Sequence, residues 1–213
     1  MSKKIKYKTV AHKARTLLIE KKSKFIASVI PVDNEPDAIN FINAIRAEFP
    51  DATHNVYAYI IDENNIFRYS DDGEPGGTAG MPVLDTMRKE GLVDAAVVVT
   101  RYFGGTLLGT GGLVHAYSSS AKQGLVEAEV VERALCDILE IRTDYSLSGK
   151  VQYLISSNNY ILEDTVYDSA VTYKICTLTE DTQRIIAGIV ESTGNKAQCE
   201  ITGQKYVNLK TEV

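Results

Sequence analysis

The chain is organised around residues 101–117, which read RYFGGTLLGTGGLVHAY. A hydrophobic run, Ala95 to Thr100, leads into this stretch, and a run with helical spacing follows it. Five glycines fall within nine residues: Gly104, Gly105, Gly109, Gly111 and Gly112. Glycine adopts positive φ at little cost and lets other groups approach the backbone, so this density after a strand indicates a shaped binding loop.

This loop supplies the first set of candidate ligand-binding residues. A phosphate or carboxylate at a helix start near Gly112 would take donors from Arg101 and from backbone amides. The loop does not match nucleotide motifs: no glycine precedes Lys and Ser/Thr as in a P-loop, and Val114 stands where G-x-G-x-x-G needs its third glycine. A tight turn that packs a strand against a helix remains the alternative. The candidates are Arg101, Tyr102, Gly104, Gly105, Gly109, Gly111, Gly112 and His115.

A second candidate site is acidic. Residues 70–82 read SDDGEPGGTAGMP, too rich in Gly and Pro for regular structure. Asp71, Asp72 and Glu74 could bind a divalent metal or share a proton for acid–base chemistry, although they do not match an EF-hand loop. Ordinary turn acids, or an internal ion pair with Arg68 or Arg101, are the alternatives.

His54, just before a predicted strand, is a candidate general base or a hydrogen-bonding strut. No H-E-x-x-H, G-x-S-x-G or Cys/His signature accompanies it. Asp71, Asp72, Glu74 and His54 are therefore candidates for catalysis without an assembled catalytic set.

Composition places the chain among ordinary globular proteins. Its 213 residues fit two domains, and 44% hydrophobic residues are enough for real cores. No apolar run approaches the roughly 20 residues of a membrane span, and the N-terminus lacks a secretory signal or lipidation motif, so we expect no membrane partner. Three widely spaced cysteines, Cys136, Cys176 and Cys199, fit buried thiols in a reduced cytoplasm rather than a metal site. We expect a cytoplasmic protein without metal or cofactor.

Charge is distributed unevenly along the chain. The net charge is −5, yet residues 1–24 hold nine Lys/Arg and one Glu, a local charge of +8. A basic leading segment could contact phosphate or an acidic partner. Solvated lysines on an edge strand are the alternative reading.

Hydrophobic periodicity predicts a mixed α and β organisation up to about residue 128. In the helix that follows the glycine loop we expect Val114, Tyr117, Ala121 and Leu125 on the apolar face. The predicted elements are a hairpin of strands 14–20 and 24–31, a helix over 36–49, a second hairpin of strands 55–61 and 66–69, a helix over 82–90, a strand over 94–101, and that final helix.

The pattern of predicted helices and strands changes from about residue 136. The pattern predicts strand 135–142, helix 148–157, strands 160–167 and 170–177, helix 180–191 with Thr179 as N-cap, and strand 198–209. This β-α-β-β-α-β order is the ferredoxin-like pattern. With a boundary near 130–136, we predict an α+β protein of two domains, 1–133 and 134–213.

Two segments, residues 68–82 and 98–117, closely resemble the YigZ/Impact family, as do His54 in A-T-H-N and Ser23-Lys24-Phe25. The resemblance covers nearly the whole chain: an Impact-type N-terminal domain and the smaller C-terminal domain of bacterial members. It implies a first domain like the second domain of a small-subunit ribosomal protein. It implies a second, ferredoxin-like domain resembling domains of elongation factor G.

The resemblance also implies a function. Both structural relatives touch ribosomal RNA or the ribosome, and the eukaryotic relative Impact regulates a translational stress kinase by competing for its activator protein. We therefore expect a translation-linked binding or regulatory protein whose partner is RNA, the ribosome or a translation-associated protein. Some bacterial members carry a dipeptidase label, but this sequence has no recognisable metal-ligand set, which favours a binding protein over an enzyme.

The sequence departs from the family at three usually basic positions. Leu107 replaces the basic residue of G-G-I-K-L-G, His115 replaces the arginine of R-A-Y, and Met81 stands where arginine is frequent. Arg101 is left as the main cation at the loop, and His115 could regain charge at mildly acidic pH.

Three functions compete. The first is the translation-linked binding protein. The second is a small-molecule hydrolase that uses Asp71, Asp72, Glu74 and His54 around a phosphate held by the Arg101 loop. The third is a protein–protein interaction module whose glycine loop is only structural. They differ in whether Asp72, Glu74, Arg101 and His54 must line a common cleft.

Overall fold

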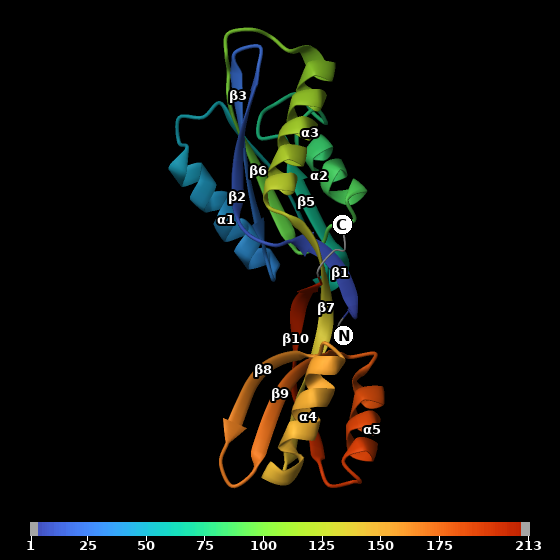
Figure 1. Ribbon diagram of the computed structural model, residues 1–213. Coiled ribbons are helices and arrows are strands. Elements are labelled where there is room, and N and C mark those ends of the chain that lie inside the picture. Colours follow the sequence, from blue (N-terminus) through green and yellow to red (C-terminus); the bar gives the residue numbers. More distant parts are fainter. Residues whose placement is uncertain (1–3, 210–213) are drawn as a thin grey trace. The chain divides into compact units, whose positions relative to one another are not determined.

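The computed structural model describes residues 4–209, which form two compact units (Figure 1). One unit holds residues 7–132, and the other holds residues 4–6 together with 133–209. Both combine a sheet with helices, and each has its own buried hydrophobic cluster. The prediction of a two-domain α+β protein is therefore confirmed.

The first domain is built on an antiparallel sheet of order β2-β3-β6-β4-β5. Both predicted hairpins, β2–β3 and β4–β5, are present in this sheet. The elements up to its end are β1 (Lys6–Val10), β2 (Ala14–Glu20), β3 (Ser23–Pro31), α1 (Glu35–Glu48), β4 (His54–Ile61), η1 (Glu63–Asn65), β5 (Ile66–Ser70), α2 (Gly80–Lys89), β6 (Ala95–Tyr102) and α3 (Gly109–Glu127).

The β2–β3 hairpin closes on a two-residue loop. Glu20 pairs with Ser23, which leaves Lys21 and Lys22 as the turn. Both turn residues have positive φ, 44° and 69°, as a two-residue turn that follows the right-handed twist of the strands requires. The hairpin tip therefore presents two adjacent lysines.

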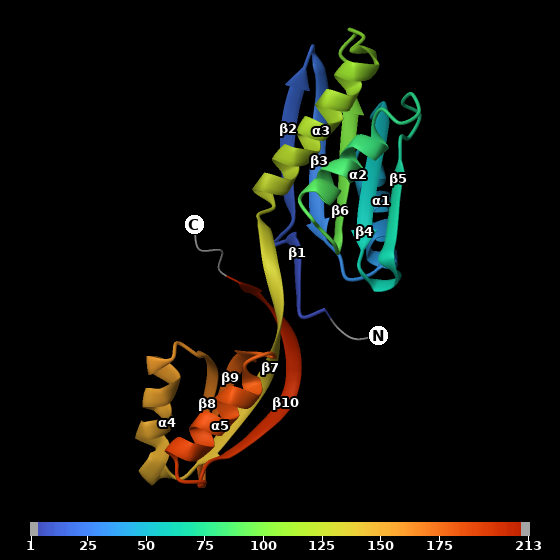
Figure 2. The ribbon, with the colours of Figure 1, turned by 90° about the vertical axis from the view of Figure 1, so that its right-hand side faces the viewer.

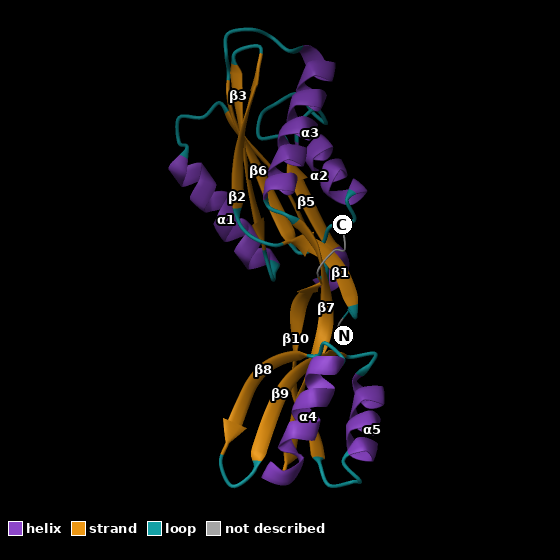
Figure 3. Ribbon diagram, in the orientation of Figure 1, coloured by secondary structure: helices purple, strands orange, loops and turns teal. Residues whose placement is uncertain are grey.

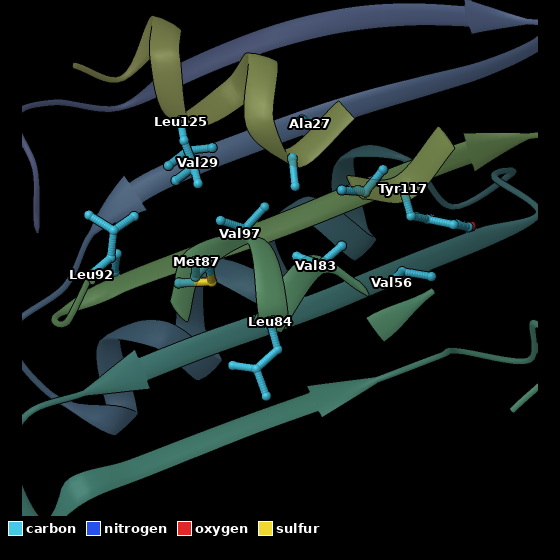
Figure 4. Close-up of a cluster of buried hydrophobic side chains, with 14 of the residues drawn as sticks. Ala27, Val29, Val56, Val83, Leu84, Met87, Leu92, Val97, Tyr117 and Leu125 are labelled. Atoms are coloured by element: carbon cyan, nitrogen blue, oxygen red, sulfur yellow. The ribbon is translucent and has the colours of Figure 1, made fainter. Parts of the chain in front are cut away.

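Helices cover both faces of this sheet (Figure 2). Because side chains alternate along a strand, Val97 and Val99 of β6 pack beneath α2 and α3, whereas Ala96 and Val98 face α1. Figure 4 shows the first of these faces, with Val97 beside Val83 and Met87 of α2. Burial on both faces explains why the run from Ala95 to Thr100 is apolar without alternation.

Helix α3 differs from its prediction in two ways. It begins at Gly109, which has a positive φ of 74°, rather than near Gly112. Val114, predicted on the apolar face, is 39% exposed, and Leu113 is buried instead. The buried stripe continues at helical spacing through Ala116, Tyr117, Ser120, Ala121, Gly124 and Leu125.

The second domain has the predicted ferredoxin-like order. Its elements are β7 (Val130–Thr143), α4 (Tyr145–Ser157), β8 (Ile161–Tyr167), β9 (Val171–Leu178), α5 (Thr182–Ser192) and β10 (Gln198–Leu209). In the sheet, β7 pairs with β9, with β10 and with β1, and β8 is the edge strand beyond β9. Val151 of α4 and Ile185 of α5 share one cluster with Leu139 of β7 and Tyr173 of β9, so both helices cover the same face (Figure 3).

Two predictions in this domain need correction. Thr179 is not the N-cap of α5: the helix begins at Thr182, and the Thr179 hydroxyl donates instead to the Leu135 carbonyl. All three thiols are free, but Cys199 is only half-buried, unlike Cys136 and Cys176. Burial raises the pKa of Cys136 to about 12, which keeps this thiol protonated and unreactive.

Across residues 4–209, no helix combines the length and the apolar character that crossing a bilayer requires.

Candidate functional site

A cavity of about 440 Å³ lies at one end of the first domain, where the acidic loop meets the glycine loop. Four separate segments contribute to its walls, so two motifs that are distant in sequence share one site. Its lining residues are Thr53, His54, Glu74, Pro75, Arg101, Phe103, Leu107, Leu108, Gly109, Thr110 and Leu113.

Strand register brings the polar residues of this site together. Arg101, near the end of β6, is paired with His54 of β4 on one side and with Phe25 of β3 on the other. Directly paired residues of neighbouring strands point to the same face of a sheet. The three side chains therefore lie on the face that α2 and α3 cover.

Glu74 is the centre of a buried polar network. Its Oε1 accepts hydrogen bonds from Arg101 Nη1 at 2.5 Å and from the Tyr117 hydroxyl at 2.8 Å. The Glu74 and Arg101 side chains are only 4% and 6% exposed. Burial, reinforced by the Glu74 carboxylate, raises the pKa of Tyr117 far above its usual value, so this hydroxyl remains a neutral donor.

The charge of Arg101 is thus already compensated within the protein. An ion pair between the acidic cluster and Arg101 was one of the alternatives predicted from the sequence, and Glu74 is the acid that forms it. The guanidinium also lies 5.3 Å from the Phe25 ring centre and 5.6 Å from that of Phe103. Its Nε is buried without a hydrogen-bond partner among the described residues.

His54 connects the network to the acidic loop. Its Nδ1 lies 2.8 Å from the carbonyl oxygen of Asp72, and because a carbonyl only accepts, Nδ1 carries the proton. Its Nε2 lies 3.7 Å from Glu74 Oε1. Through its bond to the Asp72 carbonyl, His54 acts as a hydrogen-bonding strut, one of the two roles predicted for it, whereas its role as a general base stays a prediction.

Asp71 has a structural role. Its carboxylate accepts from the backbone N–H groups of Gly77, Ala79 and Gly80 at 2.8–3.0 Å, and so holds the chain at the start of α2. Negative charge at a helix N-terminus is favourable. Asp71 does not line the cavity.

Asp72 is also engaged away from the cavity. Its carboxylate accepts from the backbone N–H of Asn55 at 2.6 Å and from Arg46 at 2.9 Å. The predicted cluster of three cooperating carboxylates does not form, because each acid has different partners. Within residues 4–209, no group of three or more His, Cys, Asp and Glu side chains is placed to hold a metal ion.

The role of Asp71 is testable. Asp71→Ala is expected to lower the free energy of unfolding by about 0.5–2 kcal/mol, the usual range for a lost N-terminal cap, because three backbone donors lose their acceptor. Asp71→Asn keeps an acceptor oxygen and should recover part of this loss. Urea denaturation measures both, with Asp85→Ala, an exposed acid of α2, as control. If Asp71→Ala were as mild as Asp85→Ala, the capping role would be wrong.

The remaining candidates from the glycine stretch are scattered. Of the five glycines, only Gly109 lines the cavity, whereas Gly111 and Gly112 lie in the first turn of α3. Gly104 packs against the backbone of Lys22 and Ser23, and Gly105 has a φ of 81°. His115 is exposed and does not line the cavity.

Tyr102 follows Arg101 and points to the other face of the sheet, where its hydroxyl donates to Asp51 at 2.9 Å. Sequence reasoning did not identify Tyr117 or Ser23 as site residues. Ser23 Oγ accepts from Gly104 N at 3.1 Å and contacts Arg101 Nη2 at 3.4 Å. The family match at Ser23-Lys24-Phe25 could have indicated Ser23 as a site residue. Tyr117 was predicted only as a core residue.

Comparison with known proteins covers both domains. Residues 21–125 match the family described as "Impact N-terminal domain", and residues 141–196 match "Domain of unknown function (DUF1949)". "IMPACT family member YvyE" of Bacillus subtilis is 38% identical over 192 residues, which are 90% of this chain and 88% of the relative. "IMPACT family member YigZ" of Escherichia coli is 33% identical over 158 residues, 73% of this chain and 78% of the relative.

Two further comparisons extend this similarity. "Protein IMPACT homolog" of Dictyostelium discoideum is 39% identical over 106 residues, 47% of this chain and 30% of that protein. A solved structure described as "Crystal structure of an hypothetical protein" superposes with a TM-score of 0.60 at 27% identity, and covers 94% of this chain and 98% of its own. The similarity to the Bacillus protein and to this structure thus extends over both domains.

Proposed function

The chain belongs to the YigZ/IMPACT family, and from this membership we propose that it is a regulatory binding protein linked to translation. The partner would be RNA or a ribosome-associated protein, in the cytoplasm. One observation carries the choice of binding over catalysis: the two buried charges of the cavity, Arg101 and Glu74, pair with each other, while apolar side chains form its rim. Phe103 is 47% exposed and Leu107 is 84% exposed.

The rim has the character of a docking surface. Pro75, Leu108 and Leu113 extend the apolar lining beneath Phe103 and Leu107. Contiguous apolar surface on a loop carried by a rigid scaffold is typical of an interaction site. Leu107 occupies a usually basic position of the family, so this member would rely more on apolar contact there than on charge.

A small-molecule hydrolase remains the second candidate. His54 and Glu74 line one cavity with Arg101, which is the observation in its favour. The proposed catalytic set is reduced, however, because Asp71 holds the start of α2 and Asp72 bonds Asn55 and Arg46. A histidine and one ion-paired carboxylate would have to perform the chemistry.

Cosedimentation with purified bacterial ribosomes tests the proposal. The wild-type protein is expected to sediment with ribosomes at low salt, and Leu107→Asp is expected to reduce the bound fraction at least fivefold, because a charge replaces the most exposed apolar contact. The matched control is Val126→Asp, which changes a 63% exposed side chain of α3 outside the cavity and should leave binding unchanged.

The two kinds of partner give different results in this experiment. Binding to salt-washed ribosomes supports a contact with RNA or the ribosome itself. Binding only to unwashed ribosomes supports a ribosome-associated protein. Absence of binding to both preparations, or equal losses with Leu107→Asp and Val126→Asp, would contradict the proposal.

A further inference from the structure

A second groove, of about 450 Å³, shares Phe103 with the cavity. Two lysines and three aromatic residues contribute to it, and none of its lining residues is acidic. They are Lys22, Lys24, Ile26, Phe49, Tyr102 and Phe103. Cations interleaved with aromatic rings distinguish this groove from the neighbouring cavity, whose charges are mutually compensated.

The groove exists because α1 covers only part of the sheet face on which it packs. Lys24 of β3 is paired with Tyr102 of β6, and Ile26 follows Lys24 on the same face. Helix α1 ends at Glu48, and Phe49 forms its C-cap before Pro50. Where the helix no longer covers the sheet, Lys24 is exposed, and Tyr102 and Phe49 are partly exposed.

The hairpin tip is held against the aromatic residues. Gly104 lies so close to the backbone of Lys22 and Ser23 that no Cβ would fit between them. Ser23 Oγ accepts from the Gly104 amide at 3.1 Å, and the Tyr102 hydroxyl donates to Asp51 at 2.9 Å. The backbone segments that carry the lysines and the rings are therefore held together before any ligand arrives, which lowers the entropic cost of binding.

One of the neighbouring acids is neutralised by a cation that does not line the groove. Glu48 is engaged with Arg15, whose two terminal nitrogens donate to its carboxylate at 2.5 and 2.8 Å. Asp51 keeps its negative charge, because the Tyr102 hydroxyl that donates to it is neutral, and Glu20 is paired with Ser23 at the base of the turn that carries Lys21 and Lys22. The hairpin tip is a basic site in a chain whose net charge is −5.

We propose that this groove binds an unpaired nucleotide of single-stranded RNA. A base stacks on the exposed ring of Phe103 and the partly exposed ring of Tyr102, and Lys22 and Lys24 pair with the adjacent phosphates. Aromatic stacking combined with lysine–phosphate contacts is the general chemistry of single-strand recognition. The choice of RNA over DNA rests on the proposed function, whereas the choice of an anionic ligand with a planar ring rests on the groove itself.

Fluorescence anisotropy with labelled oligo-U and oligo-A of eight nucleotides tests this site. Binding is expected at 50 mM salt and should weaken as salt rises. The double variant Lys22→Ala/Lys24→Ala should bind at least tenfold more weakly, and the slope of log affinity against log salt should fall by about 1.4, or about 0.7 per lost phosphate contact.

Aromatic variants have a different signature. Phe103→Leu and Tyr102→Leu should each weaken binding by about fivefold to a hundredfold, because each removes a stacking surface worth about 1–3 kcal/mol, while the salt slope stays unchanged. The control Lys89→Ala/Lys122→Ala removes two lysines that line a different surface groove of the same domain, and should bind as the wild type does. Circular dichroism verifies that each variant is folded.

Several results would overturn the assignment. These are no binding of either oligonucleotide at 50 mM salt, equal losses in the groove and control lysine pairs, or equal affinity for duplex RNA. Displacement of the RNA by a tighter-binding acidic peptide would assign the groove to a protein partner instead, and equal affinity for DNA of the same sequence would remove the choice of RNA. If the wild-type protein bound ribosomes but not the oligonucleotides, this inference alone would be wrong. If it bound the oligonucleotides but not ribosomes, only the proposed function would be wrong.

Discussion

Replacing Glu74 by alanine is expected to lower the free energy of unfolding by about 3–5 kcal/mol, the range observed when one partner of a buried ion pair is removed. The carboxylate accepts from both Arg101 and Tyr117, and its loss leaves a guanidinium that is only 6% exposed without a counter-charge. Urea denaturation monitored by circular dichroism measures the loss. It would be among the largest effects of a single substitution in this domain.

A matched control lies in the same domain. Arg15 and Glu48 form an ion pair with the same shortest distance, 2.5 Å, but their side chains are 36% and 47% exposed. Glu48→Ala should therefore shift the denaturation midpoint far less, because water solvates the remaining charge. Replacing both buried partners, as Glu74→Leu/Arg101→Met, should recover part of the loss since no buried charge remains. Equal effects for Glu74→Ala and Glu48→Ala would contradict the buried network.

Gly104→Ala is expected to destabilise the first domain by about 3 kcal/mol, the upper part of the usual range for an overpacked site. The new Cβ would overlap backbone atoms of Lys22 and Ser23, and a backbone cannot move aside by changing a rotamer. The glycine loop would have to separate from the hairpin tip. RNA binding is therefore expected to weaken together with stability.

Gly111→Ala is the control within the same glycine cluster. A Cβ at this position meets no atom within 4 Å, and the residue lies in the first turn of α3 without positive φ. Alanine is preferred to glycine in a helix, so Gly111→Ala should be neutral or stabilise by up to about 1 kcal/mol. If both substitutions had the same effect, the close approach at Gly104 would not control the loop.

Most of the secondary structure could be predicted from local sequence patterns. The last strand, Gln198–Leu209, has the predicted bounds, and both hairpins and the β-α-β-β-α-β order are confirmed. Errors occurred where a local rule had competitors. Thr179 has the chemistry of an N-cap but bonds Leu135 instead, and the apolar stripe of α3 uses Leu113 rather than Val114 because the helix packs on β3 from that side.

The site could be predicted only in part from the sequence. The motifs identified His54, Glu74 and Arg101, which the structure brings to one cavity. They could not separate Glu74 from Asp71, because three acids within four residues look equivalent until their partners are known. The groove of Lys22, Lys24 and Tyr102 was not anticipated either, since the basic segment was considered without the strand that supplies the aromatic rings.

By itself, the sequence determined the two-domain α+β class and the position of most helices and strands, because periodicity and turn residues act over a few positions along the chain. Only the tertiary structure decided which charges pair and which surfaces stay open. The pairing of Arg101 with Glu74, and of Lys24 with Tyr102, depends on strand register and loop closure across 27 and 78 positions. Such contacts arise from the simultaneous packing of β3, β4, β6 and α3, and no local segment encodes them.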